Sequence, residues 1–193
     1  MSISLVKGQK ISLAKDSGAA LSRVIMGLGW DVKKVRGLFG GLKDGPEIDL
    51  DASCAVFDEG KNLLDSIWFK QLNSKDGNIK HTGDNRTGAG DGDDEQIIVE
   101  LANLAPTVKS LVFVVNSFTG QSFAKIENAF CRIVDASNNQ EVARFELSSQ
   151  GEHTAQIMAK VYRHNGEWKM HAIGENTSAR TFHELMPAIL PHL

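Results

Sequence analysis

Short segments in which apolar and polar residues alternate recur along the whole chain. Residues 48–58, "IDLDASCAVFD", are a clear example, because every even position from 48 to 56 is apolar while the opposite face begins with Asp49, Asp51 and Ser53. A period of two residues sends successive side chains to opposite faces of a β-strand. The chain is therefore expected to fold mainly as β-structure.

Comparable segments predict strands at residues 3–5, 11–13, 24–31, 48–58, 65–71, 96–101, 109–116, 128–135, 141–147, 155–163 and 167–173. Short strands at this close spacing favour a β-sandwich. The first two, separated by "VKGQK", are expected to form a hairpin with Gly8 at its turn, and "HNGEW" predicts a turn before the last strand. Residues 178–190 are the best helical candidate, shortened by Pro187.

The segment at 33–47, "KKVRGLFGGLKDGPE", departs from this alternation because it is rich in glycine and basic residues. It predicts a long flexible loop, and a contact surface for a partner or a membrane is the alternative. With 193 residues, the chain is expected to form one domain spanning 1–193.

Composition narrows the classes of partner. The formal charge of −3 is too small to favour nucleic acid or an anionic membrane as the main partner. The N-terminus lacks a signal-peptide pattern, and no apolar run is long enough to cross a bilayer. Cys54 and Cys131 lie in strand-like apolar segments and are expected to be reduced core thiols. We therefore expect a cytoplasmic protein.

Residues 83–95, "GDNRTGAGDGDDE", hold five carboxylates and four glycines. Acids at this density repel one another unless water disperses them or a cation gathers them. An EF-hand is excluded because Arg86 and Ala89 occupy positions that require an oxygen ligand and a glycine. A phosphate-binding P-loop is disfavoured because its lysine and Ser/Thr are missing.

Three interpretations of this segment remain: a solvated acidic turn, catalysis by paired carboxylates, and a calcium site. Further acids at the ends or faces of apolar strands weaken the first, and no nucleophile or base stands out for the second. Calcium is favoured because it takes six to eight oxygen ligands, whereas magnesium keeps several waters and zinc prefers Cys and His. The candidate ligands for one or two calcium ions are Asp31, Asp49, Asp51, Asp84, Asn85, Asp91, Asp93, Asp94 and Glu95.

Together these motifs resemble the TerD family of tellurium-resistance and bacterial stress proteins. The resemblance lies in "GLGWD" at 27–31, "DLDAS" at 49–53 and "HTGDNRTGAGDGDDEQI" at 81–97. It continues through "NAFCRIVD" at 128–135 and "ELSSQGEHTAQIMAKVYRHNGEWKMHAIGE" at 146–175, and so covers nearly the whole chain. The motifs "IWF" and "VNSFTGQSF" make the chain most similar to the TerZ branch.

The resemblance implies an antiparallel β-sandwich of two sheets with short peripheral helices and calcium-binding acidic loops at one end. It also implies a gene cluster linked to tellurite resistance, phage inhibition and colicin tolerance, whose members assemble with one another, some at the inner face of the cytoplasmic membrane. The ligands implied by matching positions are Asp31, Asp84, Asn85, Asp91, Asp93, Asp94 and Glu95. The assignment of Asp49 and Asp51 as ligands rests more on their position in the strand than on the resemblance.

The expected function is that of a non-enzymatic calcium-binding protein of a tellurite-resistance or stress-response system. Calcium would order the acidic loops for assembly with other tellurium-resistance proteins, with peripheral contact at the inner membrane face as a further expectation. Two alternatives stay open: a calcium-dependent membrane-recruitment module, and a metal-dependent enzyme acting on a phosphorylated or oxyanion substrate. No nucleic acid partner is expected.

Overall fold

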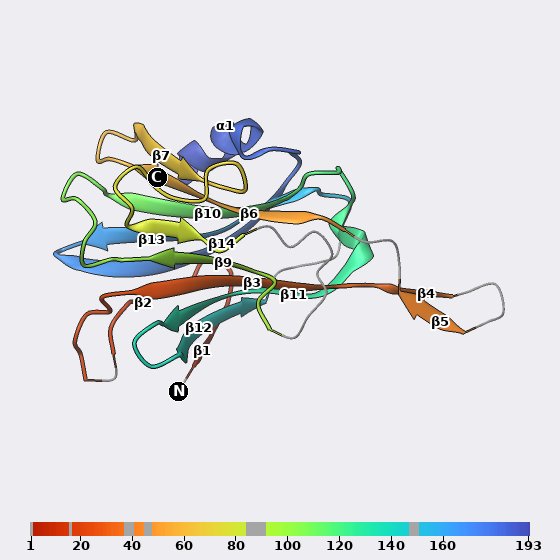
Figure 1. Ribbon diagram of the computed structural model, residues 1–193, viewed down its shortest axis with the longest axis horizontal. Helices are drawn as coiled ribbons and strands as arrows, with labels where there is room; N and C mark the ends of the chain where they lie inside the picture. The colour runs from red at the N-terminus through yellow and green to blue at the C-terminus, as the bar shows by residue number, and fades with distance from the viewer. Residues whose placement is uncertain (1, 16, 37–40, 45–47, 84–91, 147–150) are drawn as a thin grey trace.

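The alternating segments form strands that pair into two sheets, each with six strands (Figure 1). The computed structural model describes residues 2–15, 17–36, 41–44, 48–83, 92–146 and 151–193. In spatial order, sheet A consists of β1 (Ile3–Leu5), β12 (Gln140–Glu146), β11 (Ile126–Asp135), β3 (Val24–Val32), β9 (Glu95–Val99) and β8 (Ile79–His81). Sheet B consists of β2 (Lys10–Ser12), β14 (Glu167–Thr177), β13 (Ala155–His164), β10 (Ser110–Ser117), β6 (Leu50–Phe57) and β7 (Leu63–Ile67).

The two sheets pack face to face around one apolar core, which confirms the β-sandwich. The alternation in β6 illustrates how the core is filled, because Leu50, Ala52, Cys54 and Val56 all point into it. The described strand pairs are antiparallel with one exception, β1, which runs parallel to β12. The predicted turn at "HNGEW" joins β13 to β14, and Asn165 and Gly166 both have the positive φ that such a two-residue turn requires.

The expected hairpin between the first two strands is wrong. β1 adds to β12 in sheet A, whereas β2 adds to β14 in sheet B. Gly8, with φ of 86°, lies in the turn where the chain passes from one sheet to the other. Leu5 and Leu13 are both buried in the core between the sheets. Alternation fixes which side chains point inward, but it does not identify the neighbouring strand, and so the hairpin could not be distinguished from this arrangement.

The C-terminal segment lies on the outer face of sheet B, and the predicted helix is confirmed only in part. It forms a 3-10 turn at Phe182–Leu185, the single helical turn α1 (Met186–Ile189) and a second 3-10 turn at Leu190–His192. None of the helices in the described residues has the length and hydropathy needed to cross a membrane. Phe182, Leu185 and Ile189 form a second apolar cluster with side chains from the outer face of sheet B.

The segment at 33–47 was expected to be a loop, but it contains two short strands. β4 (Lys34–Arg36) pairs with β5 (Leu42–Asp44) in an antiparallel ladder that projects from the end of the sandwich (Figure 1). Three-residue strands next to glycines carry too little alternation to be recognised in the sequence. β8 was missed for the same reason.

Candidate metal centre

The glycines of the motif "GLGWD" leave part of the outer face of β3 without side chains, so that another segment can lie against it. The alternate residues Met26, Leu28 and Trp30 point into the core, which leaves Gly27 and Gly29 on the outer face. A Cβ at Gly27 would lie 2.2 Å from Oδ2 of Asp93, and one at Gly29 would lie 2.5 Å from the Phe130 ring. The two glycines therefore allow the end of the acidic segment to pack directly on the strand.

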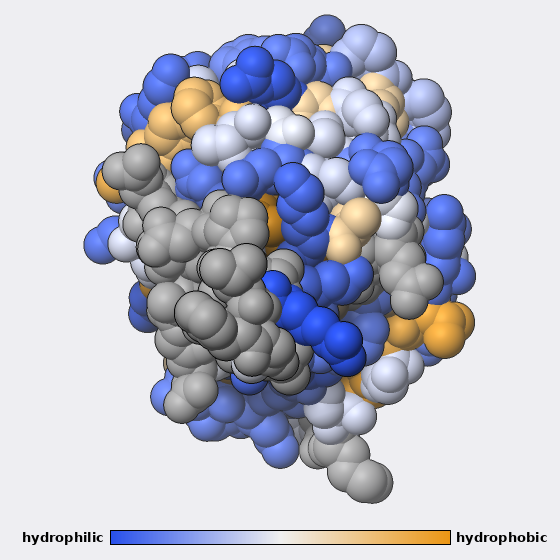
Figure 2. Space-filling view, turned by 90° about the vertical axis from the view of Figure 1, so that its right-hand side faces the viewer, coloured by the Kyte–Doolittle hydropathy of each residue, from blue (hydrophilic) through white to orange (hydrophobic). Residues whose placement is uncertain are grey.

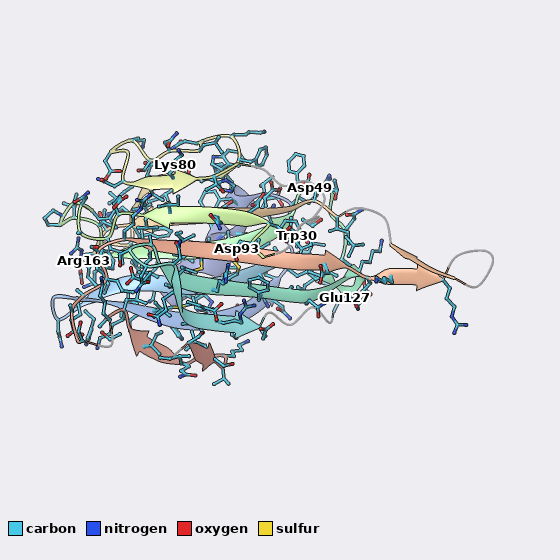
Figure 3. All side chains as sticks on the ribbon, turned by 60° about the horizontal axis from the view of Figure 1, so that its bottom comes forward. Trp30, Asp49, Lys80, Asp93, Glu127 and Arg163 are labelled. Atoms are coloured by element: carbon cyan, nitrogen blue, oxygen red, sulfur yellow. The ribbon has the colours of Figure 1, made fainter. Side chains whose placement is uncertain are left out.

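Asp93 anchors the acidic segment to sheet A. Its Oδ1 accepts a hydrogen bond from Nε of Arg132 at 2.7 Å, and its Oδ2 accepts one from Nε2 of Gln96 at 3.0 Å. The side chain is 1 % exposed, and its label lies beside β3 in Figure 3. The hydrogen bond to Asp93 is the main cause that raises the pKa of Arg132. Both carboxylate oxygens thus already serve protein donors.

Asp31 and Asp94 line the same cavity. It has a volume of about 380 Å³ and is lined by Trp30, Asp31, Gly92, Asp94, Asn128, Phe130, Arg144 and Glu146. Oδ2 of Asp94 accepts the backbone N–H of Trp30 at 2.9 Å, and Oδ2 of Asp31 accepts a hydrogen bond from Nδ2 of Asn128 at 2.8 Å. The structure therefore brings together two of the predicted ligands.

The electrostatics of this cavity favour a cation. Burial raises the pKa of Asp94, and the neighbouring carboxylates of Asp31, Glu95 and Asp93 raise it further, whereas the hydrogen bond from Trp30 lowers it. One positively charged side chain, Arg144, also lines the cavity. Its guanidinium lies 3.9 Å from the centroid of the Phe130 ring. This guanidinium pairs with Glu141 outside the cavity at 3.1 Å and with Glu146 of the lining at 3.8 Å, so its charge is shared between two acids.

Glu95 lies between the two sheets. Its side chain is fully buried, and Oε2 accepts the backbone N–H of Ala52 in β6 at 2.7 Å. The same oxygen lies 3.4 Å from Nε2 of His81, whose Nδ1 accepts the N–H of Gly83 at 3.1 Å. Glu95 thus ties β9 and β8 of sheet A to β6 of sheet B.

Asp49 and Asp51 are not among the described residues that line this cavity. Asp51 points to the outer face of sheet B, where it is 3 % exposed and Nδ2 of Asn116 lies 3.5 Å from its Oδ2. Asp49 shares that face by alternation and lies at the same end of the molecule as Trp30 (Figure 3). Asp84, Asn85 and Asp91 fall outside the described residues.

Sequence reasoning missed three polar side chains of the cavity: Asn128, Arg144 and Glu146. The alternation pattern does not identify Asn128 as a cavity residue, because β11 changes register between Glu127 and Phe130 and so interrupts the alternation. Arg144 and Glu146 lie on β12, whose pairing with β11 cannot be deduced from either strand alone.

The described lining supplies carboxylate and amide groups and no thiol or imidazole. Such oxygen donors suit a hard cation such as calcium or magnesium and do not suit zinc. Within the described ranges, however, no three His, Cys, Asp or Glu side chains are arranged to hold a metal ion by themselves. The donor chemistry therefore fits a hard cation such as calcium, but the described residues do not form a metal site by themselves.

The comparison with known families agrees with the motifs that surround this cavity. A family model for the TerD domain matches residues 1–187. The chain belongs to the TerD family. Among its relatives, the tellurium resistance protein TerZ of Serratia marcescens is 48 % identical over 95 % of this chain and 94 % of its own length.

Two further relatives widen the range of names within the TerD family. The stress response protein SCP2 of Bacillus subtilis is 44 % identical, covering 92 % of this chain and 94 % of that protein. The tellurium resistance protein TerD of Serratia marcescens is 41 % identical over 91 % of each chain. The chain is thus related along almost its entire length to proteins named for tellurium resistance and stress response.

A solved structure supports the fold. A homologue of the telluride resistance protein TerD from Streptomyces coelicolor A3(2) superimposes with a TM-score of 0.67 and 21 % identity. The likeness covers 83 % of this chain and 92 % of that one. At this identity it establishes the shared sandwich and carries no information about ligands.

Proposed function

We propose that this TerD-family chain is a non-enzymatic calcium-binding protein of a bacterial tellurite-resistance or stress-response system. The observation that carries the proposal is the cavity at the end of β3, in which Asp31 and Asp94 approach each other among other oxygen-bearing side chains. Its neighbouring carboxylates disfavour the ionised form of Asp94, and a bound divalent cation would reverse that effect.

In this proposal the acidic residues have different roles. Asp31 and Asp94 bind the cation, and Asp84, Asn85 and Asp91 complete its shell on the basis of the sequence alone. Asp93 positions Asp94 through its contact with Arg132, and Glu95 fixes the start of β9 through Ala52. Asp49 and Asp51 stay a prediction for a second ion on the side of sheet B.

The environment of the thiols supports a non-enzymatic role. Cys54 and Cys131 are both fully buried. Burial raises the pKa of both thiols, that of Cys131 to about 12. Since the thiolate is the reactive form, neither cysteine is suited to reduce tellurite in the folded protein.

Calcium would act by ordering a surface for other proteins. The end of the molecule that carries Asp31 is mostly hydrophilic in its described part (Figure 2), which suits a polar, reversible contact. We propose other tellurium-resistance proteins of the same system as partners, with peripheral contact at the inner membrane face as a second role for this end.

Titration calorimetry tests the metal site directly. The chelator-stripped protein is titrated with calcium and, in parallel, with magnesium. We expect saturable calcium binding that D31N combined with D94N abolishes, since the amides remove two charges while an amide oxygen at position 94 can still accept the Trp30 N–H. Glu59→Gln is the matched control, because Glu59 is an exposed acid paired with Lys109 far from the cavity lining. Absence of calcium binding in the unaltered protein would overturn the proposal.

A further inference from the structure

The outer face of sheet B is divided into two halves with opposite character. On β6, β10 and the first part of β13, an apolar group of outward side chains is covered by the C-terminal segment; these are Ala55, Phe57, Val112, Val114, Ala155 and Ile157. On β2, on β14 apart from Ile173 and on the second part of β13, the outward side chains are polar or charged. They include Lys10, Ser12, Lys160, Tyr162, Glu167, Lys169, His171 and Glu175. Their direction follows from the neighbours in between, such as Ile11, Val161 and Met170, which pack into the core.

Three basic side chains of this polar half form one row across three adjacent strands. In the strand register, Lys160 of β13 is directly opposite His171 of β14, and His171 is directly opposite Lys10 of β2. Side chains opposite each other on one face of an antiparallel pair are close neighbours. Like charges in that position destabilise the pairing. Protonation of His171 between Lys10 and Lys160 is therefore unfavourable in the absence of an anion.

The environment increases this electrostatic cost. Burial lowers the pKa of His171, and Lys10, Lys160 and His192 lower it further. Burial is also the main cause that lowers the pKa of Lys160, and the charges of Lys10 and Lys61 lower it further. His171 is thus kept mostly neutral at pH 7, in a partly dehydrated region between two lysines.

Nearby acids do not neutralise the row. Within the described part of the chain, no carboxylate lies within the 4.0 Å ion-pair distance of Lys10, Lys160 or His171. Glu175 faces the same region but pairs with Nε2 of His192 at 3.0 Å. Glu167, at the far end of β14, accepts a hydrogen bond from Oγ of Ser12 at 3.2 Å.

Lys160 is held in position for a ligand. Its ammonium donates to the backbone oxygen of His192 and lies 5.0 Å from the centroid of the Tyr162 ring. An ammonium has three N–H donors, so two remain for another acceptor. The C-terminal segment therefore forms one side of the row and gives it depth.

We propose that Lys10, His171 and Lys160 bind a small anion that carries phosphate groups. Neighbouring strands lie about 4.8 Å apart, so the row extends over about 10 Å, which suits one compact multivalent anion. Lysine ammonium groups are common phosphate ligands, and the imidazole N–H adds a further donor. The site belongs to sheet B and does not depend on the calcium proposed at the end of β3.

Binding is measured with pyrophosphate as the probe, in the full chain stripped of divalent cations so that no metal can bridge the anion. Calorimetry gives the affinity, and NMR titration of the imidazole signals gives the pKa of His171. We expect saturable binding that raises this pKa, because an adjacent anion favours the protonated ring. Vesicles with phosphatidylglycerol, compared with phosphatidylcholine alone, test whether a lipid headgroup supplies the phosphate instead.

The variant Lys10→Gln with Lys160→Gln is expected to weaken pyrophosphate binding at least about tenfold, since two charge-assisted contacts are lost. Lys80→Gln, on β8 of sheet A (Figure 3), makes the same kind of change elsewhere and should leave the affinity unaltered. If the double variant loses binding to phosphatidylglycerol vesicles and Lys80→Gln does not, the same site binds the phosphate of a lipid headgroup. If the double variant does not fold, His171→Gln provides the same test. Equal weakening by Lys80→Gln, or no saturable binding to either probe, would overturn the proposal.

Discussion

At the level of single residues, Gly27 controls whether the acidic segment can lie on the sheet. Gly27→Ala would place a methyl group within 2.4 Å of the Asp93 carboxylate and would disturb its hydrogen bond with Arg132. We expect the substitution to lower the free energy of unfolding by about 1–3 kcal/mol, as is typical of overpacking. Urea denaturation measures the change.

Gly41→Ala is the matched control for Gly27, because a Cβ at Gly41 meets no atom of the described residues within 4 Å. Its unfolding midpoint should stay within experimental error of the unaltered protein. Equal stability of both alanine variants would contradict the packing of Asp93 against β3.

The two cysteines give a second prediction at this scale. Because both thiols are buried and the pKa of each is raised, a thiol reagent such as Ellman's reagent should react with neither in the folded protein. Both should react at once in denaturant. Rapid modification of one thiol under native conditions would show that its strand opens readily.

Residue types in the sequence indicated a cation site, but they could not assign a role to each acid. Asp93, Asp94 and Glu95 are consecutive, yet they point to Arg132, the cavity and the space between the sheets respectively. The partner of Arg132 was unknown from sequence because it lies 39 positions away. Spacing along the chain says little about direction where a loop turns into a strand.

At the level of elements, the strands with strong alternation were predicted well. β3, β10, β11, β13 and β14 all overlap their expected ranges. The errors concern three-residue strands and strand partners: β4, β5 and β8 were missed, and β1 and β2 were given each other as neighbours. Partner choice depends on contacts between distant segments, which a local pattern does not contain.

The C-terminal segment offers a test of its packing. Leu185 is 1 % exposed within the second apolar cluster, so Leu185→Ala should cost about 2–5 kcal/mol of stability. Leu190→Ala removes the same atoms from a side chain that is 42 % exposed and should change stability little. Chemical denaturation of the two variants side by side measures the difference. Similar losses would show that the segment does not pack on sheet B as described.

At the level of the whole molecule, calcium bound only by the folded state should stabilise the entire sandwich. At a free calcium concentration a hundred times the dissociation constant, the gain is about 2.7 kcal/mol. For a chain of this size this corresponds to a rise in melting temperature of about 5–10 °C. Calorimetric or fluorescence melting with calcium and with chelator measures the shift.

The variant D31N with D94N is the control for this shift, and it should melt at the same temperature in calcium and in chelator. An unaltered protein that melts identically in both would argue against a calcium site anywhere in the chain. A shift that persists in the double variant would move the site to other acids, such as Asp49 and Asp51.

The separate placement of β1 and β2 has a consequence for how the protein is made. Both strands are synthesised long before their partners, β12 and β14, which lie far downstream in the sequence. β1 and β2 can therefore join their sheets only after these distant segments have been made, and pairings between distant segments form slowly. During translation, β1 and β2 therefore have no sheet neighbour until β12 and β14 have been synthesised.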